Sequence, residues 1–339
     1  MLESNTKKLL NDEIYIAARE EWFSKLDGLY NGKKQSPPVR LWGKAFFPPV
    51  DPYSNIEGYV AAALEMMPAD IDSIMDTEVF RPLCFEFGLY GVHFIDKILG
   101  AQVFFQDGQW YNHPLETPVG SLSAPDLECD ETWNLAKKAA ECFLAQDVKL
   151  PLFSLPTIAS ALNVAVNLYG EEILVSLMTE PNAALHDLEI INELLITIHK
   201  WYLVNIPEKQ LQPVVSSMRT QPRGYGQICG CTTQLISPDI YRELIAPLDA
   251  QLLSGYENGG MMHLCGAHAQ HIPTFKAMPQ LRAFQLNDRA AADLELYYKG
   301  LRDDQILYVN VFEEMSAKKA LKITGGNRLV LVENRPKNH

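Results

Sequence analysis

The sequence predicts an α/β protein, a single closed (β/α)8 TIM barrel over residues 39–335 with an N-terminal helical extension over residues 1–38. Short apolar runs of about four to eight residues alternate with helical patterns of about 10 to 20 residues, which is typical of parallel strands covered on both faces by helices. About eight such units fill most of the 339 residues, which favours a closed barrel over an open sheet.

The first units follow from local patterns. Thr6–Leu29 has apolar residues at helical spacing, and Lys33–Pro38 ends this helix with turn-forming residues. The next expected elements are a strand within Val39–Phe47, a helix over Asn55–Met67, and a strand and loop over Ile71–Phe80.

The middle and the C-terminal half continue the alternation. Expected strands are Ala101–Gln106, Val148–Ser154, Gln212–Ser216, Gly226–Cys231, Gly260–His263, Leu281–Leu286, Gln305–Val311 and Val330–Val332. Expected helices are Glu131–Gln146, Thr157–Tyr169, Glu171–Met178, Glu180–Ile206, Pro238–Tyr256, Leu294–Leu301 and Glu313–Ile323.

Composition excludes several classes of protein. The 29 Lys and Arg against 42 Asp and Glu give a net charge of −13, and without a basic block nucleic-acid binding is not expected. No apolar run reaches the roughly 18 residues of a membrane span, and Met1–Lys8 does not resemble an export signal, so we expect a cytoplasmic protein. Six cysteines in such a chain are expected to be free, buried or metal-bound. Glycine-rich phosphate-binding motifs are absent, which disfavours dehydrogenases and ATPases.

The strongest chemical signal is Gly259–Gly266, which reads GGMMHLCG. Because strand side chains alternate, His263 and Cys265 point to the same side at the end of an apolar strand. An imidazole nitrogen and a thiolate are two of the ligands that zinc prefers. A buried histidine with a small core cysteine is the alternative interpretation.

This segment carries a family resemblance. His263-Leu-Cys-Gly266, preceded by Ser237-Pro-Asp-Ile-Tyr and by Gly170–Pro181, resembles the uroporphyrinogen decarboxylase superfamily. That grouping contains decarboxylases of haem biosynthesis and zinc-dependent methyltransferases that act with corrinoid proteins. The resemblance covers roughly residues 39–332 and implies a TIM barrel.

Two branches of the superfamily are possible. The decarboxylases have an arginine-rich stretch near their start, whereas this chain keeps Arg40 alone there. The resemblance implies Arg40 as a carboxylate anchor and Asp76 as the acidic residue of the second strand. Tyr225, one of several aromatic residues expected near the barrel mouth, is the third candidate catalytic residue. The His263 and Cys265 pair fits the methyltransferase branch better.

The sequence does not decide which residue is the third metal ligand. The methyltransferase pattern has a second cysteine near the last strand, but no cysteine follows Cys265. Asp288, at the end of the next strand, is the first choice; Cys229 or Cys231, one strand earlier, is the alternative. His268 and His271, three residues apart, are expected to be a surface pair at a helix start; metal binding by them is the weaker interpretation.

The sequence therefore predicts a zinc-dependent methyltransferase that moves a methyl group from a small O-, N- or S-methyl compound to cobalamin on a partner corrinoid protein. A uroporphyrinogen decarboxylase-type carboxy-lyase and a non-catalytic ligand-binding barrel are the alternatives. We expect no membrane or nucleic-acid partner, and leave a homodimer open.

Overall fold

The computed structural model describes residues 2–333, so the predicted end of the barrel at residue 335 lies outside the described residues. Eleven strands are described: β1 (Val39–Leu41), β2 (Cys84–Phe85), β3 (Val103–Gln106), β4 (Gln109–Asn112), β5 (Leu152–Ser154), β6 (Leu211–Gln212), β7 (Gly226–Cys229), β8 (Gly260–Leu264), β9 (Leu281–Leu286), β10 (Ile306–Asn310) and β11 (Leu329–Val332).

Nine of the strands, all except β3 and β4, run parallel to their neighbours. Six of them form one sheet in the order β1-β11-β10-β9-β8-β7, and β2, β5 and β6 form a second. Isolated parallel bridges between Leu41 and Phe80 and between Lys44 and Leu83 connect β1 to the segment that leads into β2. The structure is thus a mixed α/β fold whose two parallel sheets meet beside β1.

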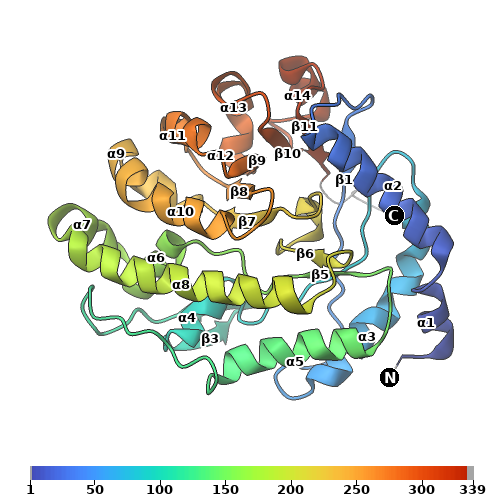
Figure 1. The fold of residues 1–339 in the computed structure, drawn as a ribbon, viewed down its shortest axis with the longest axis horizontal. Helices are drawn as coiled ribbons and strands as arrows, with labels where there is room; N and C mark the ends of the chain where they lie inside the picture. The colour runs from blue at the N-terminus through green and yellow to red at the C-terminus, as the bar shows by residue number, and fades with distance from the viewer. Residues whose placement is uncertain (1, 334–339) are drawn as a thin grey trace.

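Helices surround these strands, as Figure 1 shows. The α-helices are α1 (Ser4–Leu9), α2 (Glu13–Tyr30), α3 (Ile56–Met66), α4 (Phe94–Ile98), α5 (Glu131–Ala145), α6 (Ala161–Tyr169), α7 (Glu171–Thr179), α8 (Pro181–Asn205), α9 (Pro238–Ile240), α10 (Ala246–Leu253), α11 (Ile272–Ala277), α12 (Asp288–Ala292), α13 (Leu294–Gly300) and α14 (Ala317–Thr324). Within residues 2–333, no helix combines the length and the hydropathy that crossing a bilayer requires.

Apolar side chains fill the space enclosed by the strands. Every second residue of each strand points inward, as for Met261 of β8 and Ala283 of β9, and these residues form one buried cluster with the inner face of α2. Helix α2 lies across the amino ends of the strands: Trp22 stacks on Phe80, and the Tyr30 hydroxyl lies 3.4 Å from that of Tyr308. The amino ends are therefore closed by packed aromatic rings.

One predicted strand was wrong. Ile71–Phe80 begins within a 3₁₀ helix, η1 (Met67–Met75), because its buried residues Ile71 and Ile74 are three apart rather than two. The strand predicted in Ala101–Gln106 is present as β3, but it pairs with β4 in an antiparallel hairpin outside the parallel sheets, and the turn residues Asp107 and Gly108 both have positive φ. The parallel strand that follows β1 in the chain is instead the two-residue β2.

Two predicted helices are interrupted. Thr6–Leu29 divides between α1 and α2, with a break over residues 10–12. Pro238–Tyr256 divides into α9, a π-helical turn over Tyr241–Ile245, and α10. Pro247 is the second residue of α10, in the first turn, where backbone N–H groups have no partner inside the helix. Its lack of an N–H group therefore costs no helical hydrogen bond.

Candidate metal centre

Strands β7 and β8 bring a thiol and an imidazole together at their carboxyl ends. Cys229 and His263 are partners in the parallel register of the two strands, so their side chains point the same way. The Gly230 N–H donates to the His263 carbonyl at 2.8 Å, and a Cβ on Gly230 would lie only 2.6 Å from the Met262 sulfur. This close approach brings Cys231, the next residue, back over the strand ends.

The ligand atoms of Cys229, Cys231 and His263 all lie within 4.8 Å of one another. The Cys265 sulfur lies 2.8 Å from that of Cys231, which puts a third thiol beside the group. Thiolates and a neutral imidazole in such a group match the ligand set of a zinc site. We call Cys229, Cys231 and His263 the thiol–histidine cluster.

Hydrogen bonding from the Cys231 thiol lowers the pKa of Cys229 and of Cys265, and the pKa of Cys231 itself is raised. His263 lowers the pKa of both flanking thiols further, by its charge and, for Cys265, by a hydrogen bond. Because metal binding requires deprotonated cysteine, a lowered pKa at Cys229 and at Cys265 favours binding of a divalent cation.

A chain of amides orients His263. Its Nδ1 atom is hydrogen-bonded to the Gln285 side-chain oxygen, and Gln285 Nε2 donates to Asn310 Oδ1 at 2.5 Å. Asn310 in turn donates to Asn287 at 2.9 Å. The Gln285 oxygen can only accept a hydrogen bond, so Nδ1 carries a proton, and Nε2 is the nitrogen available to a metal when the ring is neutral. No sequence pattern indicated these hydrogen bonds, because His263 and the three amides come from the ends of three adjacent strands, β8, β9 and β10.

The expected surface pair His268 and His271 is fully buried. His268 Nδ1 lies 2.9 Å from the Thr233 hydroxyl, and its Nε2 faces the Cys265 carbonyl. His271 Nε2 lies 2.8 Å from the Thr233 carbonyl. Both rings therefore hold the loops around the thiol–histidine cluster, and the expectation that they lie at the surface was wrong.

Asp288 does not join this cluster in the part of the chain that the structure describes. It is exposed at the start of α12, its φ is 45°, and its carboxylate accepts from Asn287 Nδ2 at 3.1 Å. The register of β7 with β8 supplies the two cysteines instead, although the sequence interpretation ranked them second.

The three candidate catalytic residues also lie elsewhere. Arg40 points outward from β1 and pairs with Glu333 at 2.7 Å. Asp76 precedes the segment that enters β2, pairs with Arg81 at 3.3 Å, and its carbonyl accepts from the Trp22 indole.

Tyr225 comes just before β7 and packs against Tyr30, with ring centroids 4.7 Å apart. Asp76 and Tyr225 thus lie at the closed amino ends of the strands, opposite the thiol–histidine cluster. The structure does not bring any of the three to this cluster.

The acidic residue at the carboxyl end of β2 is Glu86, not Asp76. Glu86 is 9% exposed, its carboxylate accepts from the Ser217 N–H at 2.6 Å, and burial raises its pKa to about 7. Arg219 follows in the 3₁₀ helix η3 (Ser217–Arg219), and its charge partly offsets the raised pKa of Glu86. The signal for Glu86 was an acid inside the apolar run Phe85–Phe87.

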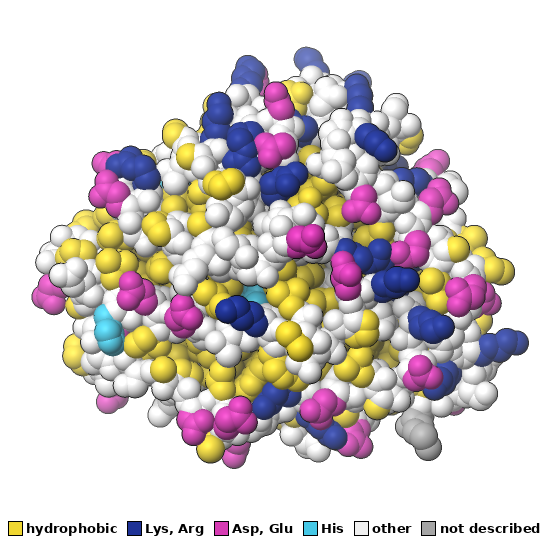
Figure 2. All heavy atoms as spheres, viewed as in Figure 1, with side chains coloured by type: hydrophobic (Ala, Val, Ile, Leu, Met, Phe, Trp, Pro, Cys, Tyr) yellow, Lys and Arg dark blue, Asp and Glu magenta, His cyan; other side chains and the backbone are white. Residues whose placement is uncertain are grey.

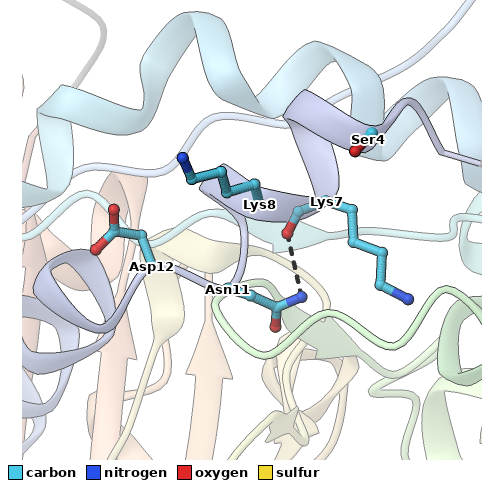
Figure 3. A pocket seen from close by; sticks show the side chains of 5 residues that line it. All are labelled: Ser4, Lys7, Lys8, Asn11 and Asp12. Atoms are coloured by element: carbon cyan, nitrogen blue, oxygen red, sulfur yellow. Dashed lines mark hydrogen bonds between the residues drawn. The ribbon is translucent and has the colours of Figure 1, made fainter.

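A surface hollow beside α1 offers no comparable chemistry. Ser4, Lys7, Lys8, Asn11 and Asp12 line it, and Figure 3 shows the two lysine side chains extending in different directions. Asn11 donates to the Lys7 carbonyl at 3.1 Å, and Lys7 pairs with Asp147 at 3.1 Å. The hollow has neither thiols nor an imidazole, and Lys7 and Asn11 already have partners, so the strand ends hold the stronger candidate site.

Comparisons with known proteins bear on the fold. No protein-family model matches the chain, and no curated protein matches its sequence. Its structure is similar to that of a methyltransferase from Methanosarcina mazei, with a TM-score of 0.64, 13% sequence identity and 92% of each chain covered. The two chains share a fold. At this identity the likeness concerns the fold alone.

Proposed function

We propose that the protein is a zinc-dependent methyltransferase of the uroporphyrinogen decarboxylase superfamily. It transfers a methyl group from a small O-, N- or S-methyl compound to the corrinoid of a partner protein. The observation that carries the proposal is the thiol–histidine cluster at the carboxyl ends of β7 and β8. The fold shared with a methyltransferase and the His263-Leu-Cys-Gly266 motif support it.

The proposal includes a closed barrel. The bridges beside β1 join the two sheets on one side. On the other, the Cys229 N–H donates to the Ile158 carbonyl at 2.7 Å, which links β7 to the segment after β5. In such a barrel, catalytic groups lie at the carboxyl ends of the strands, where the cluster is found.

Cys229, Cys231 and His263 would hold the zinc ion, with Cys265 as a fourth candidate ligand. When bound, zinc supplies Lewis acidity to the methyl-bearing heteroatom and makes it a better leaving group. Three protein ligands leave one position for the substrate, which is the usual arrangement of a catalytic site. The amide chain from Gln285 holds the imidazole in the tautomer that this requires.

The carboxy-lyase alternative depended on Arg40 and Asp76, which the structure places away from the cluster. Methyl transfer is therefore the better-supported function.

Methyl transfer to free cob(I)alamin tests the proposal, with absorbance recording the conversion to methylcobalamin. Methanol, methylamines, anisoles and methyl thioethers are the donors to screen. Zinc-loaded wild-type protein should turn over at least one donor, and His263→Ala should lose about a thousandfold or more of that rate, as expected for loss of the metal that activates the leaving group. Cys129→Ser, which replaces an exposed loop thiol, is the matched control and should keep full activity. Absence of transfer from every donor class by a zinc-loaded protein would contradict the proposal.

A further inference from the structure

The loop after β6 carries a partly buried positive charge, Arg219, that pairs with no residue in the part of the chain the structure describes. Arg219 makes no side-chain hydrogen bond and no ion pair among residues 2–333, and its Nε atom is both shielded from solvent and unpaired. Burial lowers the pKa of its guanidinium, which nevertheless stays charged. A shielded N–H group without an acceptor is costly, so an anion that arrives from outside the chain and accepts a hydrogen bond from Nε would be stabilised here.

The site that Arg219 faces is the proposed active site. The charges that act on its guanidinium are those of Cys229, Cys231, Glu86 and Cys265, in decreasing order. Glu86 is the one carboxylate among these groups, and it accepts a hydrogen bond from the Ser217 N–H group instead of pairing with Arg219. The guanidinium is thus within electrostatic reach of the thiol–histidine cluster, and its side chain makes no hydrogen bond among the described residues.

The segment that holds Arg219 is fixed from two sides. The Thr220 hydroxyl donates to the Ser217 carbonyl at 2.7 Å, and the Tyr308 hydroxyl donates to the Thr220 carbonyl at 2.9 Å. On the other side, Gly43 packs so closely that a Cβ there would lie 2.5 Å from the Met218 nitrogen. A charged side chain on a fixed segment is preorganised to receive a ligand.

We propose that Arg219 anchors a carboxylate of the substrate, so that the donors of this enzyme are small methylated compounds that also carry a carboxylate. This inference rests on the proposed function for its site. The guanidinium presents a planar pair of N–H groups that matches the two oxygens of a carboxylate. With Arg219 holding the acid end, the methyl-bearing heteroatom is directed to the neighbouring thiol–histidine cluster.

Calorimetric titration of the zinc-loaded protein with matched probes tests the inference. The acids are methylthioacetate and methoxyacetate, and their uncharged counterparts are 2-(methylthio)ethanol and 2-methoxyethanol. Arg219→Gln should weaken binding of at least one acid by about tenfold to a hundredfold, because a hydrogen-bonded charge pair is lost, and change binding of its alcohol by less than about threefold. Arg219→Lys should retain part of the preference for the acid.

Arg223→Gln is the matched control. Arg223 is another partly buried arginine, but it pairs with Glu20 near α2, and its replacement should leave the binding of acids unchanged. Circular dichroism establishes that each variant is folded.

Two results would overturn the inference. One is equal weakening of acid and alcohol together with loss of zinc, which would make Arg219 a counter-charge for the thiolates. The other is failure of the wild-type protein to bind either acid more tightly than its alcohol. A third result would separate the two proposals. If the wild-type protein holds no zinc and transfers no methyl group, yet binds the acids, and Arg219→Gln loses that binding, the anion site is supported and the proposed function is refuted.

Discussion

The two ends of the parallel strands differ in almost every physical respect. At the amino ends, α2 covers the strands with aromatic and aliphatic side chains such as Trp22 and Tyr30, which are 5% and 3% exposed. At the carboxyl ends, the buried and partly buried groups are thiols, an imidazole, a carboxyl and a guanidinium that pairs with none of residues 2–333. Stability is concentrated at one end and chemistry at the other, so replacements at the two ends should have separable effects.

On the face drawn in Figure 2, basic and acidic side chains are interspersed and apolar surface lies between them. The predictions that follow test the difference between the two ends of the strands.

Trp22→Ala should have the largest effect on stability. Its ring stacks on Phe80 with centroids 5.5 Å apart, and its indole nitrogen donates to the Asp76 carbonyl at 3.1 Å. Removing so large a buried ring should lower the free energy of unfolding by about 3–5 kcal/mol, as measured by urea denaturation. Activity per folded molecule should not change. A variant with normal stability and reduced activity would contradict the assignment of stability to the amino ends and chemistry to the carboxyl ends.

Glu86→Gln should change the pH dependence of stability. Between pH 4.5 and about 7 the unfolded chain releases the Glu86 proton while the folded protein keeps it, so ionisation favours unfolding over this range. Relative to wild type, the glutamine variant should therefore gain up to about 3 kcal/mol as the pH rises from 4.5 to 7. A difference between the two proteins that does not vary with pH would show that the folded Glu86 carboxyl ionises normally.

Gln285→Ala should weaken zinc binding by about tenfold to a hundredfold without removing a ligand, because His263 loses the acceptor that fixes its tautomer. Competition with a chromophoric chelator measures the zinc affinity. Gln285→Glu supplies an acceptor again and should restore most of it. If both variants bind zinc like wild type, the amide chain has no role in positioning His263.

Arg40→Ala should have the smallest effect. The Arg40 side chain is 39% exposed in its pair with Glu333, and such pairs contribute at most about 1 kcal/mol. We expect unchanged substrate binding and turnover. A large increase in KM would instead favour the role of carboxylate anchor that the sequence predicted for Arg40.

Sequence patterns located the long strands well and the short ones poorly. The buried runs of β8, β9 and β10 are five or six residues long and were recognised, whereas β2 has two residues and carries no periodicity. Placing the second strand over Ile71–Phe80 led to Asp76, when the acid at the carboxyl end of β2 is Glu86. An error in one strand thus became an error in a site residue.

The candidate metal ligands could be predicted only in part, because strand pairing is not visible in the sequence. His263 lies in β8 and Cys265 directly follows its end, and their spacing predicts a shared side. That Cys229 stands beside His263 depends on the register of β7 with β8, which no local pattern specifies. Asp288 was preferred because strands that follow one another in the chain are neighbours, a rule that applies equally to β7.

Zinc content per chain tests the central claim most directly. Inductively coupled plasma mass spectrometry should find about one zinc per chain in the wild-type protein and in Asp288→Ala. Cys229→Ala, Cys231→Ala and His263→Ala should each be folded and nearly zinc-free. Loss of zinc in Asp288→Ala with retention in both cysteine variants would contradict the account, as would a wild-type protein that binds no zinc when the metal is supplied.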